Sequence, residues 1–469
     1  MGVFRSSYYS QKSLNLLKIL KTPLFFALFV LEYMKLADFT EKNTRRYAMQ
    51  VLNIINICLG AVFMLCYFYQ FIYLFIAYLG GVKKFPDADP KRLAIIIAAR
   101  NEEDVIAGLI GSLIEQDYPR EFFDVFVVAD NCTDKTAEVA RAAGATVYER
   151  ENKELRGKGY AIDYLLSAIA RDRGEDAYDA YIMFDADNIA AKNYLTEMNK
   201  AFSSGYEVVS SYRNASNYGR GWRAAGQGMY FLRDARVLNL ARMRIGGNTF
   251  IAGTGFLFSN EIRKRYGGWP FHTLTEDGEF TLHNAVNDAK SGYCNSAMFY
   301  DEQVVDLRTS WNQKLRWCKG GLQIFRKYFT SLVKGLFSGK IGKFLACFDM
   351  MMCLAPAYVI SLSAIAINLV VCTVLLILGT PFLSILGSVL PLIVGAYSSL
   401  FIFGLIITIS DWKKLRASTP KKILYIFTFP IFIFSFIPAA FVALFKKVEW
   451  KQIKHGNAQG PLSEEEKNS

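Results

Sequence analysis

The amino-acid sequence predicts an α/β domain, built on a mostly parallel β-sheet, that is inserted between α-helical transmembrane and interfacial segments. Two observations lead to this fold class. Of the 469 residues, 52% are hydrophobic, and the apolar residues gather at residues 51–80 and from about 344 to 445. Between these blocks, short apolar runs alternate with helical patterns, which is the order expected for β-α-β units and a parallel sheet.

The N-terminal part, residues 1–90, is expected to hold an interfacial helix followed by a transmembrane helix. Residues 13–37 mix apolar side chains with lysine and glutamate, and their apolar centre is short for a bilayer core of about 30 Å. An interfacial helix is therefore the first interpretation and a tilted span the second. Residues 52–80 are long enough to cross the membrane once.

The α/β domain, residues 91–320, begins with a predicted strand at Leu93–Ala99. Three more strands are predicted, at residues 125–129, 146–148 and 181–184. Helices are predicted between the strands, opening at Asn101-Glu-Glu-Asp with acids in the first turn and covering residues 135–143 and 158–171. No Gly-x-Gly-x-x-Gly and no Walker lysine motif follows the first strand, which argues against a dinucleotide or ATP fold.

The C-terminal part, residues 321–455, is expected to hold an interfacial helix, transmembrane helices and a re-entrant or interfacial segment, before a polar tail at residues 456–469. Residues 350–379 and 384–410 are each long enough to cross the membrane. Residues 423–445 contain two prolines and have a lysine pair at each end. A broken, re-entrant or interfacial segment would keep both pairs in the cytosol, whereas a simple crossing would separate them.

The formal net charge of +12 is concentrated beside the apolar segments, for example at Lys83 and Lys84, at Lys413 and Lys414, and at Lys446. Positive charge in these places follows the positive-inside rule and favours contact with anionic membrane lipid. The charge pattern therefore predicts a membrane partner and no nucleic-acid partner.

Asp185 and Asp187 directly follow the predicted strand at residues 181–184, with one small residue between them. Ligands of α/β sheets gather outside the carboxyl ends of the strands, and residues i and i+2 of an extended segment point to the same side. Two carboxylates so close together repel unless a cation lies between them, and hard oxygen ligands suit Mg²⁺ or Mn²⁺. An alternative is that the pair caps a helix or lies in a polar turn.

Seven short motifs follow one another between residues 99 and 317. They are Ala99-Arg-Asn-Glu102, Asp130, Arg156-Gly-Lys158, Asp185-Ala-Asp187, Phe250-Ile-Ala-Gly253-Thr-Gly255, Thr275-Glu-Asp277 and Gln313-Lys-Leu-Arg316-Trp317. In this order, and ending just before apolar segments, the set resembles membrane-integrated family-2 glycosyltransferases, which include the cellulose, hyaluronan, chitin and poly-N-acetylglucosamine synthases. The resemblance covers residues 50 to 455 approximately. It implies a GT-A-type nucleotide-sugar-binding domain, a UDP-sugar donor and a Mg²⁺ or Mn²⁺ cofactor.

The resemblance places the UDP donor at six positions, which are Ala99, Glu102, Asp130, Lys158, Asp185 and Arg316. Glu102 and Asp130 carry acceptor oxygens for the ribose and the base, although Asp130 equally fits a helix cap. Lys158 lies between two glycines, which let its ammonium approach a phosphate closely, although a solvated lysine on a turn has the same pattern. Asp185 and Asp187 would hold the metal, a Lewis acid for the departing UDP.

Asp277 is the candidate general base, with Glu276 as a second catalytic candidate and Glu279 as a further substitute. An inverting transferase needs a carboxylate that takes the proton of the acceptor hydroxyl, and the resemblance assigns this role to the last residue of Thr-Glu-Asp. The same residues also have the pattern of a capping turn for a helix at residues 278–287.

The acceptor is expected near Gly253, Thr254, Gln313 and Trp317. Gln313, Arg316 and Trp317 have i, i+3 and i+4 spacing, so one helix face can present all three to the site. Arg316 suits the diphosphate and Trp317 offers a flat surface to a sugar. An alternative is an amphipathic interfacial helix with its Trp and Arg at the lipid boundary.

The main function expected from these residues is that of a processive inverting glycosyltransferase of the cell membrane, multi-pass, with its catalytic domain in the cytosol. It would make a β-linked homopolysaccharide, a β-glucan from UDP-glucose for an exopolysaccharide or capsule, and pass the nascent chain across the membrane. A homo-oligomer or accessory secretion proteins could complete the path. The alternatives are poly-N-acetylglucosamine synthesis from UDP-GlcNAc, non-processive glycosylation of a membrane lipid, and a non-catalytic membrane scaffold. Residues 450–455 loosely resemble a basic tail that closes over the nucleotide in some synthases.

Overall fold

The computed structural model describes residues 41–354 and 356–448. The predicted interfacial helix at residues 13–37, the basic tail at 450–455 and the polar tail at 456–469 lie outside the described residues. The chain divides into two compact units, one formed by residues 1–68 with 356–399 and the other by residues 69–355 with 400–469.

The first unit contains helical segments whose packing is largely apolar. They belong to α3 (Glu41–Leu79), α14 (Pro356–Ile377) and α15 (Phe382–Ser410). Leu52 of α3 is fully buried with Leu375 and Ile385. Asn56 of α3 adds polar contacts inside this apolar bundle, because its side chain donates to the Ser388 carbonyl and accepts a hydrogen bond from Asn368.

Four helical segments in the described residues are long and apolar enough to cross a membrane, by length and composition. They are Asn43–Leu79, Ala357–Ile377, Phe382–Ser410 and Thr419–Phe445. The last of these is interrupted, because α16 (Thr419–Phe434) ends before α17 (Phe436–Phe445) begins. Pro438 lies in the first turn of α17 and has no N–H to continue the hydrogen-bond ladder of α16, which explains the break.

The second unit is built on an eight-stranded sheet with the order β3-β2-β1-β4-β7-β6-β8-β5. The strands are β1 (Leu93–Ala99), β2 (Phe123–Asp130), β3 (Thr146–Arg150), β4 (Ala180–Asp185), β5 (Ile189–Ala190), β6 (Val208–Ala215), β7 (Phe256–Ser259) and β8 (Ser291–Asp301). Strands β3, β2, β1 and β4 are parallel, as predicted, and β6 and β8 are also parallel. Strand β7 is antiparallel to both its neighbours.

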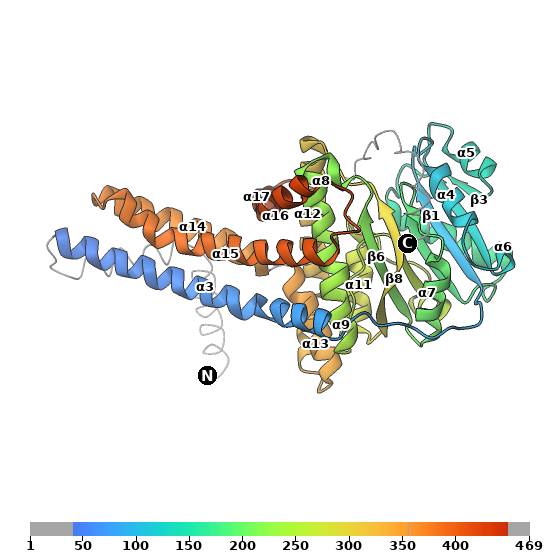
Figure 1. Ribbon diagram of the computed structural model, residues 1–469, viewed down its shortest axis with the longest axis horizontal. Coiled ribbons are helices and arrows are strands. Elements are labelled where there is room, and N and C mark those ends of the chain that lie inside the picture. Colours follow the sequence, from blue (N-terminus) through green and yellow to red (C-terminus); the bar gives the residue numbers. More distant parts are fainter. Residues whose placement is uncertain (1–40, 355, 449–469) are drawn as a thin grey trace, which may run out of the picture. The chain divides into compact units, whose positions relative to one another are not determined.

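The helices of this unit cover both faces of the sheet (Figure 1). They include α4 (Ile106–Ile114), α5 (Thr136–Ala142), α6 (Lys158–Arg173), α7 (Tyr194–Ser203), α8 (Trp222–Leu232), α9 (Leu240–Arg244), α10 (Asn260–Tyr266), α11 (Glu276–Val286), α12 (Leu307–Leu336) and α13 (Ile341–Leu354). Strand β1 shows how the core is divided: Leu93, Ile95 and Ile97 pack in one cluster with α4 and α7, whereas Ala94 and Ile96 pack in the other with α6. This alternation is the period-2 pattern of a strand that is buried on both faces.

Two predicted helix boundaries are wrong. The helix expected to open at residues 101–104 begins at Ile106, because Asn101 has a left-handed backbone (φ 55°) and the Glu102 carbonyl accepts the N–H groups of Val105 and Ile106 in a turn. The helix therefore has no acid in its first turn.

The segment predicted to cross at residues 350–379 is divided between α13, in the second unit, and α14, in the first. Helix α13 packs on α11 and α12 instead. Its Asp349 is buried in a bidentate ion pair with Arg242 of α9, with distances of 2.7 and 3.0 Å, and it accepts a hydrogen bond from Tyr69. A carboxylate needs such partners when it leaves water, so this helix belongs with the α/β domain.

Candidate active site

The carboxyl ends of three neighbouring strands bring the candidate donor residues to one edge of the sheet. Ala99 ends β1, Asp130 ends β2 and Asp185 ends β4. Strand β1 pairs in parallel with both of the other strands, and Ala98 lies directly opposite Asp185. The predicted gathering of these residues at one edge is therefore present in the structure.

Asp185 is held by contacts from two other segments. Its carboxylate forms an ion pair with Lys158, the first residue of α6, and its backbone N–H donates to the Thr254 hydroxyl at 2.8 Å. The Lys158 ammonium also donates to the Gly253 carbonyl at 2.7 Å. Gly157 has a backbone conformation that favours glycine (φ 130°), and this turn brings the start of α6 to the strand end.

Asp187 lies in a turn, and not in the extended segment that the sequence suggested. The Asn188 N–H donates to the Asp185 carbonyl at 3.2 Å and closes this turn. Partial burial raises the pKa of Asp187 well above its ordinary value, and the charges of Asp301, Asp185 and Glu102 raise it further. The carboxylates therefore repel one another, which is the situation that a divalent cation relieves.

Glu276 and Asp277 form the first turn of α11, which begins two residues before the predicted position. Burial and the charge of Asp277 raise the pKa of Glu276 to about 7. Burial also raises the pKa of Asp277, and the positive charges of Lys158 and Arg316 oppose this rise. A carboxyl group with a raised pKa beside two cations has the environment expected of a general base.

The Thr-Glu-Asp motif lies at the start of α11, as its capping alternative requires, with acids in the first turn. The Thr275 side chain makes no capping hydrogen bond, although Thr275 is the N-cap residue of α11. Glu279, the further substitute for the base, is fully buried in an ion pair with Lys327 and accepts a hydrogen bond from the Thr273 N–H. Glu279 therefore serves the packing between α11 and α12.

Glu102 and Asp130 differ in their surroundings. Burial and then the charge of Asp185 raise the pKa of Glu102 to about 8. Asp130 forms a buried ion pair with Arg150 at 2.5 Å, in which both side chains are 7% exposed. Arg150 also donates to the Leu155 carbonyl, so this pair fixes the loop that leads to Lys158. The helix-cap alternative for Asp130 is wrong, because the N-cap residue of α5 is Lys135 and the Asp130 carboxylate accepts hydrogen bonds from Asn131 and Arg150.

The three motif residues of α12 have different neighbours. Arg316 donates to the Leu274 carbonyl at 2.9 Å and lies close enough to Glu276 and Asp277 to affect both. Gln313 accepts a hydrogen bond from Gln227 of α8 at 3.0 Å. Trp317 packs among aromatic rings, with ring centroids 6.5 Å from Tyr230, 5.9 Å from Phe231 and 6.2 Å from Phe436.

Gly253 and Thr254, both expected near the acceptor, have different contacts. Gly253 has a left-handed backbone (φ 85°), and a Cβ at this position would lie 3.3 Å from the Asp277 carboxylate, so Gly253 lines the space beside the candidate base. The Thr254 hydroxyl donates to the Asn188 side chain and accepts from the Asp185 N–H. Thr254 therefore supports the turn at residues 185–188, called the Asp-x-Asp turn below.

Four residues that the sequence did not single out support this turn. Asn188 is fully buried and donates to Asp301 and Asp187, each at 3.2 Å. Asp301, at the end of β8, is held in turn by Arg213 of β6 and by Gln303 at 2.6 Å. The only sequence signal is that Asn188 follows Asp187, since the other partners lie far away along the chain.

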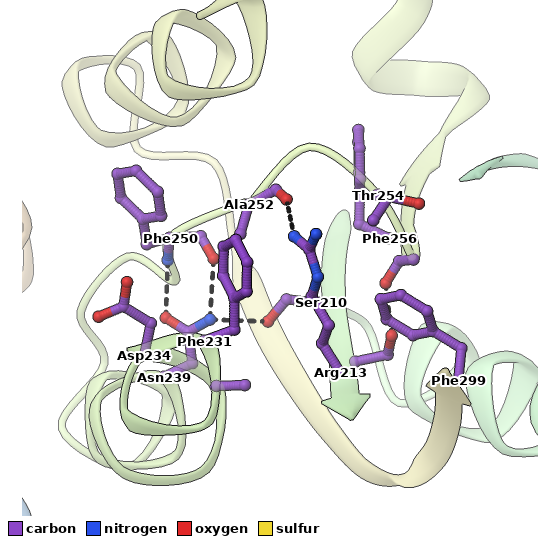
Figure 2. A pocket seen from close by; sticks show the side chains of 13 residues that line it. Ser210, Arg213, Phe231, Asp234, Asn239, Phe250, Ala252, Thr254, Phe256 and Phe299 are labelled. Carbon is purple, nitrogen blue, oxygen red and sulfur yellow. Dashed lines mark hydrogen bonds between the residues drawn. The ribbon is translucent and has the colours of Figure 1, made fainter. Parts of the chain in front are cut away.

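Arg213 connects the Asp301 carboxylate to the segment that carries Gly253 and Thr254. Figure 2 shows its guanidinium in a small pocket, donating to the Ala252 carbonyl at 2.7 Å. The guanidinium lies 3.6 Å from the ring centroid of Phe231, the penultimate residue of α8. The Arg213 side chain thus braces two sides of the site.

The other wall of this pocket is a π-helix, η3 (Arg233–Asn239). Its last residue, Asn239, donates to the Phe250 carbonyl and accepts from the Phe250 N–H, both at 2.8 Å (Figure 2). The segment at residues 250–254 is therefore anchored at both ends, by Asn239 and by the Asp-x-Asp turn.

Among the described residues, no group of three or more His, Cys, Asp or Glu side chains is arranged to hold a metal ion. The residues at the strand edge nevertheless fit a divalent cation that is shared with a ligand. Asp185 and Asp187 supply hard oxygen atoms, and Asp301 and Glu102 bring further negative charge close to Asp187.

Comparison with known proteins identifies this region as a sugar-transferring domain. Residues 90–320 match the family model described as "Glycosyltransferase like family 2". The central part of the chain is therefore similar to glycosyltransferase family 2 domains.

The chain is 28% identical over 244 residues to the β-monoglucosyldiacylglycerol synthase of a Synechocystis species, which covers 51% of this chain and 49% of that protein. It is 27% identical over 285 residues to the protein of the same name in a Nostoc species, which covers 58% and 57%. The chain thus matches about half the length of these curated relatives.

A mannosyltransferase of Pyrobaculum calidifontis, solved in complex with GDP-mannose and Mn²⁺, shares the fold. Its TM-score is 0.56 at 18% sequence identity, and the match covers 84% of this chain and 99% of that one. The predicted fold class, a GT-A-type domain with a mostly parallel sheet beside apolar helices that could span a membrane, is confirmed.

Proposed function

We propose that this protein is an inverting glycosyltransferase that uses a nucleotide sugar and adds one sugar to a membrane lipid. The observation that carries the proposal is the meeting of Asp185, Asp187 and Asp277 with Lys158 and Arg316 at one edge of a family-2 domain. This arrangement would provide a metal-binding carboxylate pair, cations for a diphosphate and a half-buried base in one place.

In the proposed reaction, the acceptor hydroxyl gives its proton to the Asp277 carboxylate while its oxygen forms a bond to the anomeric carbon of the donor. The bond from that carbon to the diphosphate breaks on the opposite face, so the configuration inverts and the nucleoside diphosphate leaves with the electron pair. Arg316 and Lys158 lie beside this carboxylate and can stabilise the charge of the leaving group.

Asp185 and Asp187 would hold Mg²⁺ or Mn²⁺, which as a Lewis acid stabilises the charge of the departing diphosphate. Glu102, Asp130 and Ala99 lie at the same strand edge and are proposed to contact the nucleoside. Gly253, beside Asp277, together with Gln313 and Trp317, is proposed to face the acceptor.

A lipid acceptor is supported better than a growing polysaccharide. The Synechocystis and Nostoc relatives are named β-monoglucosyldiacylglycerol synthases, which agrees with the lipid alternative among the predictions from the sequence. The main prediction, a processive β-glucan synthase for an exopolysaccharide or capsule, gains no support from these relatives. We therefore propose UDP-glucose as the donor and a diacylglycerol-like lipid as the acceptor.

We also propose that the protein is a multi-pass membrane protein with its catalytic domain in the cytosol. The apolar helical segments support membrane insertion, and the basic residues at their ends support the orientation. This proposal includes the domain boundaries expected from the sequence, near residues 90, 320 and 455.

The test is a transfer assay with the full-length protein in detergent, Mg²⁺ or Mn²⁺, and labelled UDP-glucose, UDP-GlcNAc or GDP-mannose. Diacylglycerol is offered as the acceptor, and products are separated into organic and aqueous phases. We expect label from UDP-glucose in the organic phase, at one sugar per lipid and with inverted configuration.

A large aqueous product that glucanases degrade would instead establish polysaccharide synthesis. Absence of transfer from all three donors, to lipid or to polymer, would contradict the proposed enzyme class.

A further inference from the structure

Lys314 is a buried lysine on α12 that lies among aromatic rings. Its side chain is 5% exposed, and its ammonium lies 4.0 Å from the ring centroid of Phe432 and 5.4 Å from that of Phe436. In the part of the chain that the structure describes, it has neither a hydrogen-bond partner nor a carboxylate partner. Cation–π contacts offset only part of the cost of burying an ammonium group.

Arg223, on α8, brings a second positive charge to the same place. Its Nη1 donates to the Val305 carbonyl at 3.3 Å, whereas its buried Nε has no hydrogen-bond partner among the described residues. Burial and then the charge of Arg223 lower the pKa of Lys314 to about 8, so the two cations repel each other.

The packing of the helices explains why these two cations are neighbours. Gln227, one turn after Arg223, donates to Gln313, the residue before Lys314. Gly226 lies under the ring of Phe432, where a Cβ would approach a ring carbon to 2.5 Å, and Lys314 lies over this same ring. Helices α8, α12 and α16 thus enclose the two charges.

This cluster lies apart from Arg316 and the carboxyl groups of the candidate active site, although it shares the ring of Phe436 with Trp317, which is proposed to face the acceptor. Arg316 is two residues further along α12 and acts on Glu276 and Asp277, and residues i and i+2 of a helix do not share a face. No carboxylate is among the causes that shift the pKa of Lys314, in contrast to Lys158, and only the Cys318 thiol acts to raise it. Two neighbouring cations without a carboxylate, one on a buried residue and the other on a half-buried residue, would be stabilised by an anion that carries several oxygen acceptors.

We infer that Lys314 and Arg223 form a binding site for the phosphate group of an anionic phospholipid. The lipid is the favoured source of the phosphate because Phe432 and Phe436, which cover the site, belong to an apolar segment long enough to cross a membrane. The outer side of this segment exposes large apolar side chains, and a lysine pair lies at each end. These exposed side chains are Ile423, Leu424, Phe427, Ile431, Phe441, Leu444 and Phe445.

The experiment uses the full-length protein, stripped of lipid, in micelles of a neutral detergent. Phosphatidylglycerol, diacylglycerol or inorganic phosphate is added, and native mass spectrometry counts the retained lipid while thermal unfolding reports the stabilisation. No sugar donor is present, so the result does not depend on the proposed transfer reaction.

We expect phosphatidylglycerol to be retained and to raise the melting temperature of the wild type. Lys314→Gln and Arg223→Gln should each weaken its binding about tenfold, since each removes a charge-assisted contact. The matched control is Lys334→Gln, an exposed lysine on the same helix, which should bind as the wild type does. Lys314→Met removes a buried unpaired charge, so it should fold stably and lose the rise in melting temperature.

Equal retention of phosphatidylglycerol by the wild type, Lys314→Gln and Lys314→Met would overturn the inference. The same holds if diacylglycerol, which has no phosphate, binds as well as phosphatidylglycerol in a Lys314-dependent manner. Stabilisation by inorganic phosphate without retention of phosphatidylglycerol would overturn the assignment to a lipid.

Discussion

Arg316 and Lys314 are two residues apart on α12, yet they lie in opposite environments. Arg316 lies beside the carboxyl groups of Glu276 and Asp277, and its positive charge opposes the rise of both pKa values. Lys314 lies over the rings of Phe432 and Phe436, with the like charge of Arg223 nearby. One helix therefore separates the carboxyl groups of the candidate active site from an aromatic face where a cation has no carboxylate to balance it.

The acidic side of this comparison is expected to respond most strongly to a change at Asp277. Asp277→Asn removes the proposed base, so kcat should fall by about 10²–10⁴-fold while the affinity for UDP stays nearly unchanged. Steady-state kinetics with UDP-glucose and calorimetry with UDP measure the two effects. Asp89→Asn, at an exposed position far from the strand edge, is the control. Wild-type turnover in Asp277→Asn would show that another group takes the proton.

The second prediction tests whether Thr254 supports the proposed metal-binding turn or contacts the acceptor. Thr254→Val leaves the Asp185 backbone N–H and the Asn188 side-chain oxygen without their partner. The affinity for Mn²⁺ should therefore fall about tenfold. Electron paramagnetic resonance of free Mn²⁺ measures this affinity without turnover. Thr254→Ser keeps the hydroxyl and should bind Mn²⁺ as the wild type does. An increased KM for the acceptor with unchanged Mn²⁺ affinity would return Thr254 to the acceptor role that the sequence suggested.

The smallest expected effect concerns the pH dependence of stability. The pKa of Glu276 is raised in the folded state, so its contribution to stability is fully present below about pH 4.5 and is lost as the pH rises through about 7. Glu276→Gln removes this loss, so its melting temperature should exceed that of the wild type by a few degrees at pH 8, and the difference should vanish toward pH 4.5. Thermal scans across this range measure it.

Glu138→Gln, at an exposed helical position, serves as the control and should follow the wild-type curve. A difference between Glu276→Gln and the wild type that does not change with pH would show that Glu276 acts through packing alone.

Much of the parallel half of the sheet could be predicted from the sequence. Strand β1 lies at Leu93–Ala99 as predicted, because seven apolar residues in a row between polar turns permit only a buried strand of that length. The meeting of Ala99, Asp130 and Asp185 followed from the rule that parallel strands end at one edge.

The support of the Asp-x-Asp turn could not be predicted in the same way. Asn188, Arg213 and Asp301 come together only because β6 and β8 pair in parallel, with Arg213 opposite Phe299, two positions before Asp301. Such a contact spans about a hundred residues, and no local pattern encodes it. The wrong boundary near residue 350 has a similar cause, because Asp349 depends on Arg242 of a distant helix.

The hydrogen bonds of Thr254 have a consequence for exchanging parts between related transferases. Thr254 follows Gly253, which lines the space beside Asp277, and its hydroxyl also holds the turn of Asp185. A loop at residues 250–255 transplanted from a related protein would therefore change the geometry of the turn at Asp185 as well. A working chimera requires that residues 185–188 are taken from the same protein as that loop.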